Sequence, residues 1–243
     1  MIVCPQPLAA EAGLSVLREG GNAVDAAVTT AFCQGVLDPQ MCGIGGSGMM
    51  VVHRPGTYPE VIEFHARAGS QVRPDMWERR FIRESADRYN FVTEGGVNDA
   101  GYQSVAVPGT VAGLALALER HGTIRWARAI EPAIAFARHG HPVSGALRAT
   151  WTSEGSPDEL PMTERIQNTA AARRIYTNDG QLKALGELLV QEDYASTLEV
   201  LAKSGPESFY QGEIAEAIVA DFGAHGGFIT REDLAGYEAE VKR

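Results

Sequence analysis

The sequence predicts an α+β fold, and three observations lead to this prediction. Apolar residues recur at helical spacing between residues 8 and 17, as in an amphipathic helix. Two short runs with β-branched residues, 49–53 and 61–65, flank a Pro55-Gly56 turn and are typical of a strand hairpin. The sheet thus begins only after two helices, whereas a nucleotide-binding βαβ unit begins with a strand.

The first quarter of the chain is expected to form two helices, a glycine loop and the hairpin. The first helix begins at Pro7 and ends at Gly20-Gly21. Asn22 then caps a second helix, residues 23–37, which is apolar on nearly every side and must therefore be buried. The loop of residues 43–48 is rich in glycine, which permits tight turns and close backbone approach. We interpret Asn22 and Asp25 as helix caps and the loop as a packing element.

The rest of the chain is predicted to be mainly helical. Residues 73–101 are expected to form helix and irregular surface structure, residues 105–109 end a short strand, and residues 153–178 form a polar loop. Thr110 is expected to cap the next helix. Helical patterns cover residues 110–121, 126–139, 194–203 and 212–222, and a last helix opens at Thr230, which stands at capping-box spacing from Asp233.

Composition and charge exclude several classes of protein. Of the 243 residues, 44% are hydrophobic and 21% are charged, close to the average of folded domains. The formal net charge of -10 repels phosphate, so we expect no nucleic-acid partner. No apolar stretch approaches the roughly 20 residues of a membrane span, and the start lacks the pattern of an export signal. We expect a cytoplasmic protein without a membrane partner; an exported form stays open if the natural start lies upstream.

Familiar catalytic motifs are missing from the sequence. The glycine loop lacks the Lys-Ser/Thr of a phosphate-binding loop, and neither a GxSxG nor an HExxH pattern occurs. The cysteines show no metal-ligand spacing, so we expect no metal and reduced, mostly buried thiols. His139 and His141 are interpreted as a solvated helix end, and three other histidines stand at turns without a partner signal: His53, His121 and His225.

A series of sequence blocks nevertheless resembles the signature blocks of γ-glutamyltransferases, in the same order and spacing. They span nearly the whole chain: GGNAVDAAV (20–28), GIGGSG (43–48), VAVPGTVAGL (105–114), residues 131–143, FYQGEIAEAI (209–218) and GGFITREDLAGY (226–237). Within them, Tyr210 and Asp233 are interpreted as structural residues. The chain is thereby identified as a member of this family.

The resemblance implies the N-terminal-nucleophile hydrolase fold, a four-layer αββα sandwich built from a large and a small subunit. Members are made as one precursor that cleaves itself before a threonine, whose hydroxyl attacks an amide carbonyl while its free α-amine acts as the base. This chemistry requires no cofactor. The threonine belongs to the small subunit, so residues 1–243 are expected to be a large-subunit region without a catalytic residue of its own.

The expected partners are therefore the small subunit that carries the threonine and a small-molecule amide substrate. Large subunits of the family continue beyond the last block, so we expect a fragment, a truncated version or a product of processing. The function expected for the complete protein is an amidohydrolase or acyltransferase. The alternative is an inactive member or fragment that acts as a scaffold or binding partner.

One family position within the chain concerns the substrate. In typical members an Arg-Glu pair ends the strand after the glycine loop, and the arginine binds the α-carboxylate of the γ-glutamyl group. Here His65 and Ala66 stand at those positions, and Arg67 follows. Since alternate residues of a strand share a face, Arg67 could bind an acidic substrate from a shifted position. The favoured interpretation is that the carboxylate clamp is lost and another amide is the substrate. A surface ion pair is the third possibility for Arg67.

Overall fold

The structure is a computed structural model that describes residues 1–86 and 88–242 of the chain. Helices and strands are both present, which confirms the predicted α+β class. The helices are α1 (Pro7–Arg18), α2 (Ala23–Leu37), α3 (Thr110–His121), α4 (Trp126–His139), α5 (Gly145–Trp151), α6 (Met162–Gln167), α7 (Ala170–Tyr176), α8 (Glu192–Ser204), α9 (Glu207–Tyr210), α10 (Glu213–His225) and α11 (Arg231–Ala235). The strands are β1 (Gly48–Val52), β2 (Glu60–Phe64), β3 (Phe81–Glu84), β4 (Phe91–Thr93), β5 (His141–Pro142), β6 (Thr177–Asn178), β7 (Gln181–Leu182), β8 (Leu188–Leu189) and β9 (Glu240–Lys242).

The main sheet has the strand order β1-β2-β9, and neighbouring strands are antiparallel. Its hairpin confirms the prediction, with Gly48 of β1 opposite Phe64 of β2. Strand β9 comes from the far end of the chain and places Val241 opposite Ile62. The sequence did not predict β9, because three residues are too few to show the alternation that marks a strand.

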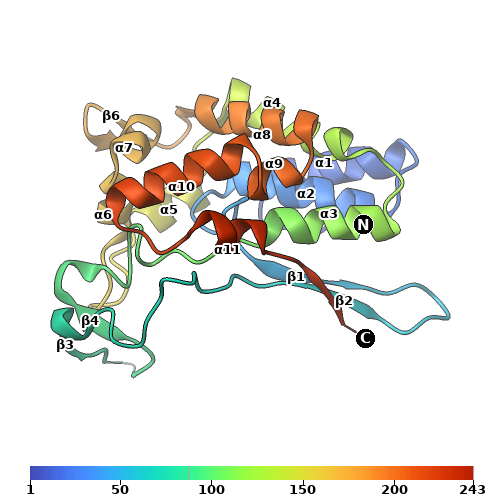
Figure 1. Ribbon diagram of the computed structural model, residues 1–243. Helices are drawn as coiled ribbons and strands as arrows, with labels where there is room; N and C mark the ends of the chain where they lie inside the picture. Colours follow the sequence, from blue (N-terminus) through green and yellow to red (C-terminus); the bar gives the residue numbers. More distant parts are fainter. Residues whose placement is uncertain (87, 243) are drawn as a thin grey trace.

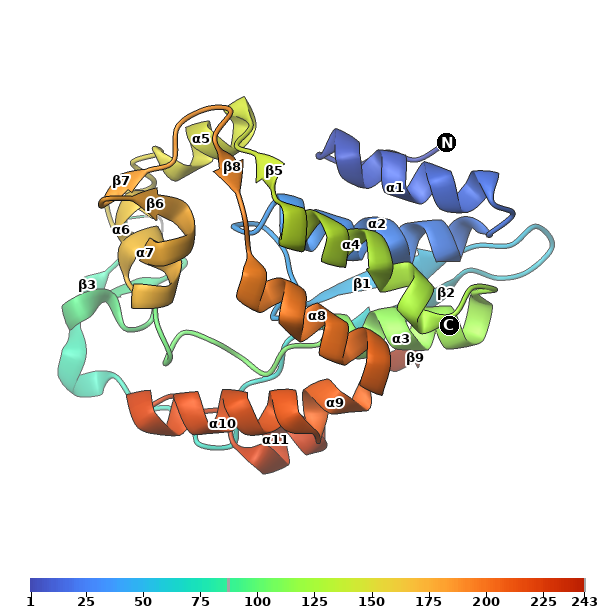
Figure 2. The same cartoon turned by 90° about the horizontal axis from the view of Figure 1, so that it is seen from above.

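Helices cover one face of this sheet, and no described element covers the other (Figure 1). Seen from above, α1, α2, α4 and α8 follow one another, and α3 packs against both α2 and β2 (Figure 2). Strand β2 directs Ile62 and Phe64 into the core beneath these helices. On the opposite face, Met49 and Val51 remain 57% and 61% exposed. The chain therefore supplies one helical layer and one sheet, which is half of an αββα sandwich.

The start of α2 is held by a capping box that extends to a distant loop. The side chain of Asn22 accepts hydrogen bonds from the backbone N–H groups of Val24 and Asp25, as predicted for a cap. The buried Asp25 carboxylate accepts bonds from the Asn22 N–H at 2.8 Å, from the N–H and hydroxyl of Thr123 at 2.7 and 2.6 Å, and from the N–H of Ile124 at 3.2 Å. Asp25 therefore ties α2 to the end of α3.

Close packing between α3 and β2 depends on two glycines. A Cβ at Gly109 would overlap the carbonyl oxygen of Phe64 and the hydroxyl of Tyr237, and a Cβ at Gly113 would overlap the Phe64 ring. Gly109 is also the N-cap of α3, so the prediction of Thr110 as the cap is wrong. The backbone N–H groups of Gly109 and Thr110 both donate to the carbonyl of Gly46, which fastens the glycine loop to the start of the helix.

Three segments differ from the predictions. Residues 73–101 contain the hairpin β3-β4 and short 3-10 turns in place of an α-helix, and residues 153–178 contain α6 and α7 in place of a loop. Both helices are short and polar, and a second apolar cluster around Trp151 and Ile166 stabilises them, which periodicity could not show. The expected strand at residues 105–109 is reduced to one bridge between Val107 and Arg67.

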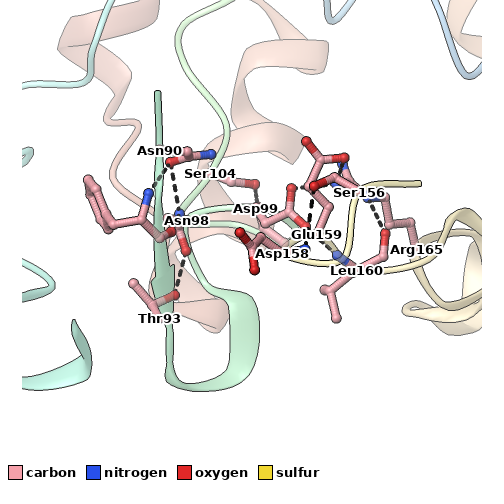
Figure 3. A network of polar contacts seen from close by, with 12 residues as sticks. Asn90, Thr93, Asn98, Asp99, Ser104, Ser156, Asp158, Glu159, Leu160 and Arg165 are labelled. Atoms are coloured by element: carbon pink, nitrogen blue, oxygen red, sulfur yellow. Dashed lines mark hydrogen bonds and ion pairs between the residues drawn. The ribbon is translucent and has the colours of Figure 1, made fainter. Parts of the chain in front are cut away.

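The lobe formed by these two segments is joined by polar contacts (Figure 3). The Asp99 carboxylate accepts hydrogen bonds from the backbone N–H of Leu160 and from the Arg165 guanidinium. The Asn98 amide donates to the carbonyl of Phe91 at 2.7 Å, which holds the loop after β4 against that strand. These hydrogen bonds join residues of the lobe to one another, so the network has a structural role.

Three histidines and one cysteine also differ from expectation. His225 has partners, since its Nδ1 lies 2.8 Å from the carbonyl oxygen of Asp221 and its ring stacks on Tyr102 with centroids 4.4 Å apart. His141 is buried in β5, because Gly140 turns the chain inward with a φ of 77°, so it is not a solvated helix end; burial lowers its pKa. His121 does have a partner, since its Nε2 lies 2.8 Å from Glu60, a contact that only the packing of α3 on β2 creates. All three cysteines are free; Cys33 is buried as expected, whereas Cys42 is exposed.

Replacing Gly113 by Ala should destabilise the protein by about 1–3 kcal/mol, because the added methyl group forces the Phe64 ring out of its place in the core. Gly223→Ala in α10 is a matched control, since open space surrounds that position and Ala is the better helix former. Urea unfolding of both variants measures the difference. Equal stability of the two variants would contradict the close-packing explanation.

Asp25→Asn should lower the free energy of unfolding by about 2–3 kcal/mol at pH 7, because the amide replaces an acceptor by a donor that faces N–H groups. Burial raises the pKa of Asp25, but the bonds from Thr123, Asn22 and Ile124 outweigh it and leave that pKa lowered. The stabilisation is thus complete above the unfolded value of about 3.9 and is lost as the pH falls through the lower folded value. Unfolding measured from pH 7 to pH 2 should show a shallower acid decline in Asp25→Asn than in wild type.

Candidate substrate-binding site

The candidate site begins where β2 leaves the core. Phe64 is buried beneath α3, and the next residues emerge on the surface: His65, Ala66 and Arg67 are all exposed. The backbone of Arg67 is nevertheless fixed, because its N–H donates to the carbonyl of Val107 at 3.1 Å and its carbonyl accepts from the Val107 N–H at 2.7 Å. The segment is therefore held at both ends, by the core and by this bridge.

Two stacked tyrosines hold the segment from His65 to Arg67 in place. The hydroxyl of Tyr237 donates to the carbonyl of His65 at 2.8 Å, and its ring stacks on Tyr210 with centroids 5.5 Å apart. The Tyr210 hydroxyl donates to the carbonyl of Pro108 at 3.0 Å and accepts from the N–H of Ala112 at 3.1 Å. The structural role predicted for Tyr210 is thus confirmed.

Asp233 fixes the segment that follows Arg67. It completes the predicted capping box of α11 with Thr230. The same carboxylate accepts hydrogen bonds from the backbone N–H of Ser70 at 2.9 Å and from its hydroxyl at 3.1 Å. Burial raises the pKa of Asp233, but the bonds from Thr230 and Ser70 outweigh it and lower that pKa. The structural interpretation of Asp233 is confirmed, and its bonds join α11 to the end of the candidate site.

The guanidinium of Arg67 already has partners within the chain. Its Nη2 lies 2.8 Å from a carboxylate oxygen of Glu240 and donates to the carbonyl of Glu238 at 3.1 Å. The guanidinium carbon also lies 5.1 Å from the ring centroid of Tyr237, a cation–π distance. Arg67 therefore reaches strand β9, and an ion pair of the kind considered from the sequence is present.

The ion pair belongs to a wider set of charges on the uncovered face of the sheet. Glu240 stands opposite Glu63 in the register, so both side chains lie on that face. Lys242 contacts Glu63 and lies 3.9 Å from the second oxygen of Glu240. The hydrogen bond from Lys242 lowers the pKa of Glu63, and the charges of His65 and Arg67 act in the same direction. The two predicted substrate-binding residues therefore lie near a common carboxylate.

The imidazole of His65, unlike the guanidinium of Arg67, is not held by a polar contact within the described residues. In residues 1–86 and 88–242, no hydrogen bond or ion pair to this side chain is found, and it is exposed beside the uncovered face. The imidazole of His65 is therefore accessible. An imidazole can serve a ligand as donor or acceptor, but it lacks the planar fork that binds a carboxylate bidentately.

Sequence reasoning overlooked two residues of this site, Glu240 and Lys242. They flank Val241 in a charged-apolar-charged triplet, which is too short for its alternation to indicate a strand. Tyr237 lay inside a recognised block, but its contacts with His65 and Arg67 depend on tertiary packing. No cluster of three or more potential metal ligands occurs in the described part of the chain. Among the described helices, none has the length and apolarity that crossing a membrane requires.

Comparison with known proteins identifies the family. Residues 9–243 match the family model described as gamma-glutamyltranspeptidase. The chain is 33% identical over 244 residues to the glutathione hydrolase proenzyme of Escherichia coli (strain K12). The aligned region covers 98% of this chain and 38% of that protein. It is 34% identical over 247 residues to the acylase ACY 1 proenzyme of Pseudomonas sp. (strain V22). That aligned region covers 100% of this chain and 41% of the acylase proenzyme.

The fold agrees with this assignment. The crystal structure of Helicobacter pylori gamma-glutamyltranspeptidase superposes with a TM-score of 0.86 at 32% identity, covering 99% of this chain and 64% of that one. The chain spans less than half the length of the two curated relatives named above. Both comparisons extend over nearly every residue of the chain, which therefore belongs to the gamma-glutamyltranspeptidase family and represents its large-subunit portion.

Proposed function

We propose that residues 1–243 form the large-subunit region of an amidohydrolase or acyltransferase. The observation that carries this proposal is the match over nearly the whole chain to relatives named as glutathione hydrolase and acylase proenzymes. The uncovered sheet face, with exposed Met49 and Val51 beside the candidate site, gives a small subunit a surface on which to pack. The partners of the chain would then be this small subunit and a small-molecule amide.

The reaction proceeds through a threonine of the small subunit, outside this chain. The threonine hydroxyl attacks the amide carbonyl while its α-amine accepts the hydroxyl proton. The amine product leaves with that proton, and the acyl group stays on the threonine oxygen as an ester. Water then releases a carboxylic acid, or a second amine takes the acyl group. The role of this chain is to bind and orient the acyl part through His65 and Arg67.

The contacts of Arg67 favour an atypical substrate over γ-glutamyl compounds. A γ-glutamyl group presents an α-carboxylate, which a free guanidinium would bind. The Arg67 guanidinium is already paired with Glu240, and the position of the usual arginine holds His65. Because an acidic ligand would have to replace Glu240, these contacts support the interpretation that the carboxylate clamp is lost and that the acyl part carries no such carboxylate.

The full-length protein should divide into two chains on incubation, and the isolated chain of residues 1–243 should cleave no amide. Replacing the threonine at the start of the second chain by alanine should abolish both division and amide cleavage, because the nucleophile is gone. Threonine→Ser keeps a hydroxyl and is the matched control. Intact mass spectrometry and an anilide assay measure the two effects. A wild-type precursor that stays whole would favour the scaffold alternative.

His65→Arg should raise kcat/KM for a γ-glutamyl anilide about tenfold or more, since it restores a guanidinium at the usual position and a hydrogen bond between charged groups contributes roughly 1.5–3 kcal/mol. His65→Gln removes the imidazole without adding a guanidinium and should give no increase. Steady-state kinetics of both variants against wild type provide the measurement. An unchanged preference in His65→Arg would count against loss of the clamp as the cause of an atypical substrate.

A further inference from the structure

Arg67 is held in place by contacts of both its backbone and its side chain. Its backbone is fixed by the bridge to Val107, and its guanidinium lies over the Tyr237 ring. Tyr237 is itself held by its bond to the His65 carbonyl and by stacking on Tyr210. The side chain of Arg67 is still 47% exposed, so a ligand can approach it. These features describe a cation that is positioned in advance at the surface.

Glu240 occupies the place that an acidic ligand of this cation would take. Its carboxylate oxygen lies 2.8 Å from Nη2 of Arg67, and the second carboxylate oxygen lies 3.9 Å from Nζ of Lys242. The Glu238 side chain is exposed nearby but contributes only its backbone carbonyl to Arg67. Glu240 therefore lies within ion-pair distance of both Arg67 and Lys242.

The charge of Glu240 determines the net charge of this part of the sheet face. With Glu240 ionised, Arg67 and Lys242 are balanced by Glu240 and Glu63. If the charge of Glu240 is removed, Lys242 keeps its contact with Glu63, whereas Arg67 keeps only the carbonyl of Glu238 and the Tyr237 ring. A guanidinium without a carboxylate partner can bind the carboxylate of a ligand.

We propose that Glu240 is a specificity-determining residue that substitutes for a substrate carboxylate at Arg67. While Glu240 holds the arginine, the site accepts acyl groups that are neutral at this point and disfavours acidic ones. This inference rests on the proposed function, since it assigns the acyl group to the surface beside Arg67. It adds the residue that sets the substrate class.

The test uses the full-length, self-cleaved protein and two matched anilides. Succinyl and butyryl p-nitroanilide have the same chain length and differ by the terminal carboxylate. Glu240→Gln should raise the ratio of kcat/KM for succinyl over butyryl substrate about tenfold, as expected for one gained hydrogen bond between charged groups. Glu238→Gln removes a neighbouring charge without breaking the ion pair and should leave the ratio unchanged. Adding Arg67→Gln to Glu240→Gln should abolish the increase.

Binding provides a measurement that does not depend on turnover. Titration calorimetry with succinate at fixed, low ionic strength should show about tenfold tighter binding to Glu240→Gln than to wild type or Glu238→Gln. An equal gain in both single variants would mean that only the overall charge matters and would overturn the proposal, as would no gain in either. If the wild-type protein neither divides nor cleaves anilides, the proposed function fails, but the succinate titration still decides the role of Glu240.

Discussion

The close approach of α3 to the end of β2 is the constraint on which the candidate site depends. Gly109 and Gly113 present no Cβ to Phe64, so the strand end can lie directly against the helix. The same gap admits the Tyr237 hydroxyl, which then reaches the carbonyl of His65. A larger residue at either glycine would separate the helix from the strand. The position at which His65 and Arg67 emerge is therefore set by backbone contact inside the core.

The chain forms half of a sandwich, because the described helices cover only one face of its main sheet (Figure 1). Strand β2 points Ile62 and Phe64 toward the helices, whereas β1 leaves Met49 and Val51 exposed. Exposed apolar side chains on a sheet face are expected where another layer packs, because burial of apolar surface stabilises the assembly. The candidate site lies at the end of β2 beside this face, so a second subunit would meet the apolar strands and the charged residues together.

Charge balance gives the site its chemical character. From the family resemblance, a shifted Arg67 was one possibility, and loss of the carboxylate clamp was the favoured interpretation. The structure adds that Arg67 is paired with Glu240, while Lys242 is paired with Glu63. An exposed ion pair contributes little to stability, so these contacts add little to the stability of the fold. Under the proposed function, a face with balanced charges would give an acidic acyl group no advantage.

Local signals in the sequence were sufficient for the elements whose residues interact over short distances. The helix periods, the Asn22 and Thr230 caps and the β1-β2 hairpin are visible in the sequence, because their contacts join residues a few positions apart. The family blocks likewise identified the fold and the large-subunit portion. The short helices α6 and α7 were missed, because their sequences show no clear helical period. The apolar cluster around Trp151 stabilises them instead.

Tertiary structure alone decided the composition of the candidate site. Arg67 and Glu240 are separated by 173 positions, and Tyr237 lies 172 positions from His65. The sequence determined that an arginine and a histidine follow β2, and that the usual Arg-Glu pair is absent. It could not determine which carboxylate pairs with Arg67, because charged surface residues carry no periodic signal and many are available. That choice follows from the addition of β9 to the edge of β2, which brings Glu240 to the same face as Glu63.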